Sequence, residues 1–326
     1  MVEKKNEDYV AELNLLSANQ LNRGELPIID LTSWFKGDLD AQRQIADSMN
    51  RLFKQVGFVY LSNQGIPQDL TDSVFQVTES FFNLPEEKKQ QVHYNRANFR
   101  KGYIPILVES ADPSAKGDFR EVYDMGLGEP FPNLWPADLP CFREILEDYS
   151  EKLLALANTI FEIFALSFNL PYDYFKSKTN KPMATFRLVN YPSMDAILEP
   201  NMLGIGTHCD CEFFTIITQN SVEGLEVKTR VDEWVKVPNI PGTVVVILGE
   251  MMARWTNNWF LPTPHRVINT SGFNRYSAVF FFAPNFDTVI SCLDCCVDQD
   301  NPLDFQPFTA GDFKAERIQK VYGHRV

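Results

Sequence analysis

THCDCEFFTIITQ, residues 207–219, is the segment that determines how this chain folds. Most of it is a run of β-branched and aromatic residues, which favours a strand. His208 and Asp210 stand two positions apart near its start. Side chains at positions i and i+2 of a strand point to the same face of a sheet. An imidazole and a carboxylate are therefore expected to project side by side.

A second imidazole and a guanidinium follow further along the chain. His265 lies in the segment PHRVIN, and Arg275 and Ser277 stand two apart in the segment NRYSA. Two histidines and one carboxylate on one face of an octahedral metal, with the other positions open, are typical of non-haem Fe(II) sites. An arginine fork binds a carboxylate through two hydrogen bonds, and a serine hydroxyl can add a third. The sequence therefore predicts a metal site with an acid-binding site beside it.

These motifs resemble the Fe(II)/2-oxoglutarate-dependent dioxygenases, in particular the isopenicillin N synthase-like family. The shared pattern is H-x-D, then about fifty residues, then H, and about ten residues later R-x-S. The resemblance covers most of the chain. Further matching segments are LPIID (26–30), GFVYL (57–61) and NQGI (63–66) towards the N-terminus, and RWTN (254–257) and TPHRV (263–267) in the core.

The resemblance implies a complete reaction. His208, Asp210 and His265 would hold Fe(II), and 2-oxoglutarate and O2 would be the co-substrates. The co-substrate carboxylate would be bound by Arg275 and Ser277, together with a tyrosine. A ferryl group would then abstract hydrogen from a C–H bond, so that a small metabolite is hydroxylated, desaturated or oxidatively cyclised.

Tyr191, in the segment NYP, is that tyrosine, although core packing is the alternative interpretation. The alternation of its strand-like segment puts Arg187 on the same side, so Arg187 is the first candidate for binding an anionic substrate. Arg100 and Lys101 are further candidates, but a solvated charge pair explains them as well. Phe281 shares the face of Arg275 and is a candidate substrate contact, with core packing as the simpler interpretation. The expected substrate is a carboxylate-bearing specialised metabolite.

Other functions stay open. Some members of the family keep R-x-S yet use no 2-oxo acid, so one alternative is an Fe(II) oxidase like isopenicillin N synthase or aminocyclopropane-carboxylate oxidase. A zinc ion could occupy the same three ligands, but open positions for an oxoacid and dioxygen favour Fe(II). A non-catalytic binding protein of the same fold is a further alternative, against which the intact set of three ligands argues.

Composition limits the partners and the compartment. The 326 residues are 44% hydrophobic and carry a net charge of −13. A negative field of that size repels nucleic acid and anionic lipid, so neither is expected as a partner. No apolar run reaches the ~18 residues of a membrane span. The charged N-terminus lacks the apolar stretch of a secretory signal. We expect a cytoplasmic monomer that acts on a small molecule.

The six cysteines indicate no disulfide framework. Three of them form the cluster CLDCC at residues 292–296. As a zinc half-site this cluster lacks a partner pair, so ordinary free thiols are the favoured interpretation. A reducing compartment would keep such thiols free and would also keep iron ferrous.

The expected fold class is mainly β with flanking helices, around a double-stranded β-helix (jelly roll) core. Eight short strands separated by Gly, Pro and Asn carry this prediction; they lie near residues 185–191, 203–208, 213–219, 224–228, 234–237, 243–248, 264–268 and 275–283. Apolar residues at helical spacing predict helices over residues 41–54, 68–82, 141–169 and 313–321.

Four regions follow from this pattern. Residues 1–130 form an N-terminal region of helices and short strands, in which 90–128 are mostly loops. Residues 131–181 contain a long support helix and a linker. Residues 182–285 are the Fe(II)/2-oxoglutarate jelly-roll core, and residues 286–326 provide a C-terminal helix that is expected to cover the site as a lid.

Overall fold

The computed structural model describes residues 26–94, 101–111, 117–127, 132–193 and 203–322. Its larger sheet has eight strands in the order β1-β2-β10-β7-β12-β5-β4-β3. Their bounds are β1 (Ile28–Asp30), β2 (Phe58–Ser62), β10 (Thr243–Leu248), β7 (Phe214–Gln219), β12 (Arg275–Asn285), β5 (Pro182–Tyr191), β4 (Glu121–Leu127) and β3 (Gly102–Ile104).

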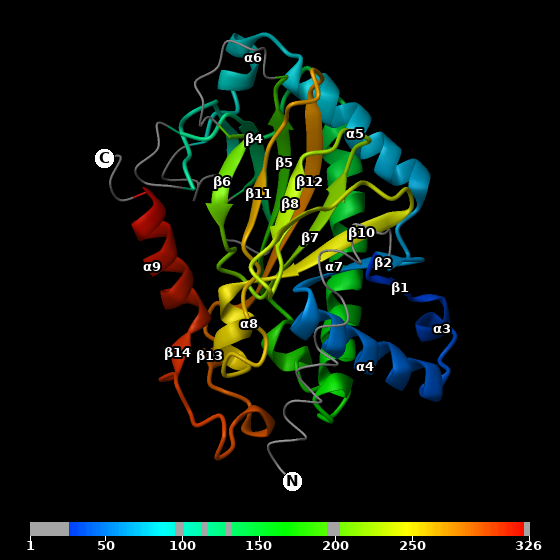
Figure 1. Ribbon diagram of the computed structural model, residues 1–326. Coiled ribbons are helices and arrows are strands. Elements are labelled where there is room, and N and C mark those ends of the chain that lie inside the picture. Colours follow the sequence, from blue (N-terminus) through cyan, green and yellow to red (C-terminus); the bar gives the residue numbers. More distant parts are fainter. Residues whose placement is uncertain (1–25, 95–100, 112–116, 128–131, 194–202, 323–326) are drawn as a thin grey trace.

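A four-stranded sheet, in the order β6-β11-β8-β9, lies over one face of the larger sheet (Figure 1). Its strands are β6 (Ile205–His208), β11 (His265–Val267), β8 (Leu225–Lys228) and β9 (Trp234–Lys236). All pairs except β1·β2 are antiparallel in these two sheets. The two facing sheets form a jelly roll, and each of the eight predicted core strands is present. A small third sheet pairs β13 (Val289–Ile290) with β14 (Phe308–Thr309).

The N-terminal region supplies both edges of the larger sheet. β2 pairs with β10 at one side of the core, and β4 pairs with β5 at the other. The predicted regions 1–130 and 182–285 therefore share one hydrogen-bonded sheet, and the boundaries drawn between them stay a prediction.

Four long helices match the predicted ones within a few residues. They are α4 (Leu39–Gln55), α5 (Gln68–Phe82), α7 (Phe142–Ser167) and α9 (Ala310–Tyr322). α9 begins earlier than predicted because the hydroxyl of Thr309 accepts from the backbone N of Asp312, which caps the first turn. Three helices of four to six residues were missed because they are too short to show a helical period; they are α3 (Thr32–Phe35), α6 (Glu86–Gln90) and α8 (Glu250–Trp255).

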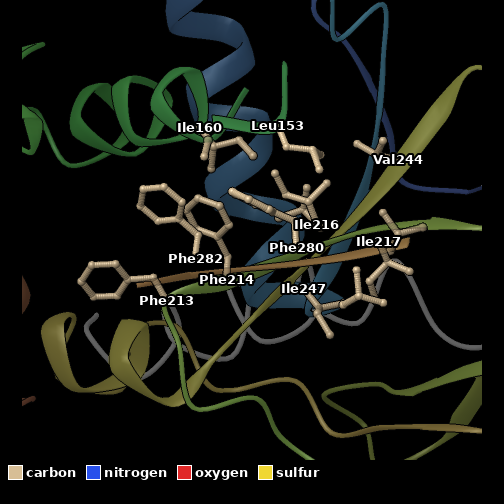
Figure 2. Packing of buried hydrophobic residues seen from close by; sticks show 14 of the residues in the cluster. Leu153, Ile160, Phe213, Phe214, Ile216, Ile217, Val244, Ile247, Phe280 and Phe282 are labelled. Atoms are coloured by element: carbon tan, nitrogen blue, oxygen red, sulfur yellow. The ribbon is translucent and has the colours of Figure 1, made fainter. Parts of the chain in front are cut away.

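The outer face of the larger sheet packs on α7 and forms the main core (Figure 2). Phe161 of α7 lies 5.3 Å from Phe214 and 5.5 Å from Phe282 between ring centroids. These rings are buried, and burial of such large apolar side chains supplies most of the stability of a fold. Throughout the described residues, every helix is too short or too polar to cross a bilayer.

The inner face of the same sheet, which faces the smaller sheet, is markedly more polar. Along β12 the residues alternate, so that Arg275 and Ser277 point inward while Phe280 and Phe282 point outward. Strand register places Ser277 opposite Gln219 and Phe281 opposite Thr215. The neighbouring strands β7 and β12 therefore both present buried polar side chains to the smaller sheet.

Candidate metal centre and active site

The side chains of His208, Asp210 and His265 come together between the two sheets. Their nitrogen and oxygen ligand atoms all lie within 4.8 Å of one another. Nε2 of His208 is 3.6 Å from Oδ1 of Asp210, and Nε2 of His265 is 3.8 Å from the same oxygen. Through the parts of the chain that the structure describes, no other group of His, Cys, Asp and Glu meets this criterion.

The pairing of two strands places the two imidazoles next to each other. β6 and β11 are antiparallel, with His208 directly opposite His265. Nδ1 of His208 lies 2.9 Å from the carbonyl oxygen of Gly206, and Nδ1 of His265 lies 3.0 Å from that of Thr263. A hydrogen on each Nδ1 would donate to these carbonyls, which leaves the Nε2 lone pairs directed at one point. Metal-binding histidines are commonly oriented in this way.

Asp210 lies in a loop that docks on the start of α8. The backbone N of Glu250 donates to the carbonyl of Asp210 at 2.9 Å. The approach is so close that a Cβ at Gly249 would clash with the carbonyl oxygen of Glu212, so only glycine is tolerated there. The hydroxyl of Thr215, on β7, donates to Oδ2 of Asp210. Glu250 therefore fixes the backbone of Asp210, and Thr215 fixes its carboxylate. Oδ1 of that carboxylate remains directed towards the histidines.

The electrostatics of the group suit a metal. Burial, followed by the neighbouring His265, lowers the pKa of His208 to about 3, so this imidazole keeps its lone pair at neutral pH. Burial raises the pKa of the Cys209 thiol to about 12, and the pKa of the Cys211 thiol also lies well above its usual value. The flanking thiols therefore stay protonated and do not compete as thiolate ligands.

Arg275 is the second component of the site. It is only 1% exposed, and its Nη2 donates to Oε1 of Gln219 at 2.7 Å. Its Nε and Nη1 are buried without a hydrogen-bond partner. Tyr191 is its cross-strand neighbour, with the guanidinium 5.0 Å from the ring centroid, and Ser277 is also buried. A buried guanidinium with unused donors is costly unless an anion binds there.

Gly224 makes room for this guanidinium. Its φ of +157° is unusual for other residues, and a Cβ there would lie 2.9 Å from Cδ of Arg275. Burial lowers the pKa of Arg275, and the adjacent Tyr191 partly opposes that shift. The backbone at Gly224 therefore leaves space for a buried guanidinium that could bind an anion.

Arg187 faces the same side as Tyr191, as predicted, but its donors are already used. Nε and Nη2 each donate to the carboxylate of Asp124 at 2.7 Å. Nη1 and Nη2 donate to Glu109 at 2.9 and 3.2 Å. Its charge is thus matched within the protein. The expectation of a carboxylate on the substrate rested on this residue, and the ion pairs remove that basis.

The remaining substrate candidates are less informative. Phe281 is partly buried, with the guanidinium of Arg187 5.8 Å from its ring centroid, so it does lie on the inner face. Lys101 is buried and has a partner of its own. Arg100 lies outside the described residues. The thiols of Cys295 and Cys296 are 4.0 Å apart but belong to no described metal-binding group, so the zinc alternative has no support.

Sequence reasoning missed two residues of the site. Thr215 and Gln219 are inward-facing positions of an apolar strand, and alternation from the buried Ile217 could have identified them.

The fold and the donor set define a class: an oxygenase that holds Fe(II) through two histidines and a carboxylate and takes a 2-oxo acid as co-substrate. Comparison with known proteins agrees. Two family models match, the non-haem dioxygenase N-terminal model over residues 26–138 and the 2OG-Fe(II) oxygenase superfamily model over residues 184–284.

Whole-chain relatives extend this match. The 2-oxoglutarate-Fe(II) type oxidoreductase hxnY of Emericella nidulans is 30% identical over 91% of this chain and 90% of its own length. The rice homoarginine-6-hydroxylase 2-ODD-233 is 30% identical, covering 87% of each chain. The crystal structure of a full-length Neurospora crassa protein in complex with alpha-KG superposes with a TM-score of 0.84 at 27% identity, over 91% of this chain and 96% of that one. The chain belongs to the 2-oxoglutarate- and Fe(II)-dependent oxygenase superfamily.

This membership makes the protein an oxidoreductase whose cofactor is Fe(II) and whose co-substrate is 2-oxoglutarate. The donor set of the three ligands and the unused donors of Arg275 fit these two groups. The main prediction from the sequence is thus confirmed, rather than the alternative of an oxidase that uses no 2-oxo acid. O2 is the expected oxidant.

Proposed function

We propose that His208, Asp210 and His265 bind the Fe(II), and that Arg275, Ser277 and Tyr191 bind the distal carboxylate of 2-oxoglutarate. The single observation that carries this proposal is the pair of unpartnered, buried nitrogens of Arg275 on the sheet face that also carries Thr215, the residue that holds Asp210. A carboxylate bound there would satisfy both nitrogens at once.

The residues of the chain have distinct tasks in this proposal. Gln219 holds the guanidinium through Nη2, so that Nε and Nη1 remain directed towards the co-substrate. Thr215 keeps Oδ2 of Asp210 occupied, which presents Oδ1 to the metal. When bound, Fe(II), 2-oxoglutarate and O2 supply an oxidant strong enough for unactivated C–H bonds. The protein orients the substrate and excludes water around it.

The substrate proposed is a small metabolite that is hydroxylated, desaturated or oxidatively cyclised. Support comes from relatives of similar length: homoarginine-6-hydroxylases from rice and soybean, the Neurospora crassa protein in complex with alpha-KG and thymine, and JOX2 in complex with 2OG, Fe and JA. The net charge of −13 is unfavourable for a nucleic-acid substrate, which supports the same choice.

Anaerobic titration of the protein with Fe(II) and then 2-oxoglutarate tests the proposal. Chelation of ferrous iron by a 2-oxo acid produces a visible charge-transfer absorption, and we expect it in the wild type. His265→Ala should remove it, because the loss of a ligand costs more than the roughly 10–100-fold in affinity that a lost supporting contact costs. Succinate release on addition of metabolites then reports turnover.

His93→Ala is the matched control, since His93 lies after α6 and belongs to no described metal-binding group. It should leave the absorption unchanged. An absorption that persists in His265→Ala would show that the ligands are wrongly assigned. Product formed without succinate would show that 2-oxoglutarate is not the source of electrons.

A further inference from the structure

A second charged cluster lies on the inner side of β4 and β5, next to the metal ligands. It contains Arg120, Arg187, Glu109, Asp118 and Asp124, joined by ion pairs of 2.7–3.5 Å. The five side chains are between 4% and 12% exposed. A buried network of this kind costs free energy in a fold, so its presence beside a reaction centre calls for a function.

One member of the cluster has an unused donor. Nη2 of Arg120 contacts Glu109 at 3.1 Å and Asp118 at 3.5 Å. Its Nε is buried and has no hydrogen-bond partner. The side chain is only 10% exposed, so water does not readily replace that partner. The donor is therefore held rigidly by two carboxylates while one of its hydrogens lacks an acceptor. Arg275 shows the same condition, and the 2-oxoglutarate proposed to bind there would resolve it.

The segment that carries Arg120 contacts the segment that carries His208. Oδ1 of Asp118 accepts from the backbone N of Gly206 at 3.2 Å, and the carbonyl of Gly206 is the contact of His208 Nδ1. The backbone N of Phe119 donates to the carbonyl of Leu203 at 2.9 Å. Residues 118 and 119, which precede Arg120, are thus hydrogen-bonded to the segment that leads into His208. The positive charge of Arg120 is also one of the influences that lower the pKa of His208.

The charge balance of the cluster limits what can bind there. Two arginines face three carboxylates, and the buried Lys101, which precedes the strand residue opposite Asp124, adds one more positive charge. Among the described residues, positive charges therefore do not exceed negative ones. A substrate carboxylate would bring a negative charge that none of the described residues compensates into a buried site, which is unfavourable. A neutral acceptor carries no such penalty.

We propose that Arg120 is a substrate-binding residue whose Nε donates to a neutral carbonyl oxygen, and that the enzyme selects amide, lactam or imide substrates over carboxylates. Glu109 and Asp118 act as positioning residues that hold the guanidinium. Arg187 belongs to this support, since all its donors meet Asp124 and Glu109. The inference rests on the oxygenase function proposed above and specifies the substrate class for the same site.

The test uses the holoenzyme loaded with Fe(II) and 2-oxoglutarate under nitrogen. Two pairs of matched probes differ only in amide against carboxylate character: benzamide and benzoate, and phenylacetamide and phenylacetate. In a third pair, uracil and orotate, the second member keeps the imide ring and adds a carboxylate. Calorimetry gives each dissociation constant, and succinate release in air gives coupling. We expect the neutral member of each pair to bind more tightly by roughly 10–100-fold, because the carboxylate member brings an unpaired negative charge into the buried site.

Two variants separate recognition from folding. Arg120→Met removes the donor but leaves Glu109 and Asp118 with one cation fewer, so it could fail to fold. Arg120→Lys keeps the charge and loses Nε, and it is expected to melt near the wild-type temperature. Both should bind the neutral probes roughly 10–100-fold more weakly than the wild type, because each has lost the Nε donor. Arg266→Lys is the matched control, because Arg266 is also ion-paired, to Glu226, and it stands on the smaller sheet. It should bind the neutral probes as tightly as the wild type does.

The outcomes are separable. Failure of the 2-oxoglutarate charge-transfer absorption in the wild type would overturn the oxygenase site itself. If that absorption forms, three results would overturn only the present inference: tighter binding of the carboxylate members, no binding of any neutral probe, or an unchanged affinity of folded Arg120→Lys for the neutral probes.

Discussion

The two faces of the larger sheet differ sharply, although the same strands build both. On the outer face, Phe280 and Phe282 of β12 are fully buried among apolar side chains (Figure 2). On the inner face, Arg275 is buried just as deeply but keeps two donors without partners. Neighbouring residues of one strand thus serve opposite purposes, because alternate side chains point to opposite sides.

Burial alone therefore does not identify a stabilising residue. The outer face lowers the free energy of the fold through apolar contact. On the inner face, the unpartnered guanidinium of Arg275 costs free energy, and binding of an anion there would offset that cost. Mutations on the two faces should therefore separate stability from ligand affinity.

The largest effect is expected on the outer face. Phe280→Ala should lower the free energy of unfolding by about 3–5 kcal/mol, because it leaves a cavity beneath α7. Chemical denaturation of the metal-free protein measures this loss. Affinity for Fe(II) and 2-oxoglutarate should stay close to wild type in the folded fraction. A large loss of ligand affinity without loss of stability would mean that the two faces are not separate in function.

Arg275→Met should give the reverse pattern. The affinity for 2-oxoglutarate should fall by about 2–5 kcal/mol, since a buried charge pair loses one partner. The unfolding free energy of the ligand-free protein should be unchanged or higher, because an unpaired buried charge is replaced by an apolar chain of similar length. Titration of the charge-transfer absorption and denaturation measure the two quantities. Clear destabilisation of the ligand-free variant would contradict the view that this guanidinium is a cost to the fold.

The smallest effect concerns two threonines that stand on opposite faces of one strand. Thr215→Val removes the hydroxyl that contacts Asp210 and should weaken Fe(II) binding roughly 10–100-fold. Thr218→Val is its control on the outer face, where the hydroxyl bonds to Tyr149 at 2.7 Å. That variant should affect stability alone, as read from its melting temperature. Equal losses of iron affinity in both variants would argue that Thr215 acts only through general packing.

The sequence was sufficient to predict the eight core strands and to name the residues proposed for the site. Alternation along residues 275–283 correctly predicted the inward position of Arg275, and the short spacing from His208 to Asp210 keeps both in one local segment. The same reasoning placed Arg187 on the correct face but could not show what meets it. Its partners Glu109 and Asp124 lie far away in sequence, and Glu109 stands in a segment without periodicity. Tertiary ion pairs of this kind leave no local pattern.

The arrangement of the sheet edges limits how this enzyme can be dissected. β2 and β4 flank the core on opposite sides, so a fragment starting after residue 131 would leave β10 and β5 with open backbone donors and acceptors (Figure 1). Such exposed edges recruit strands from other molecules. The catalytic half is therefore expected to aggregate when expressed alone, and any chimaera between relatives must exchange both flanks together with the centre.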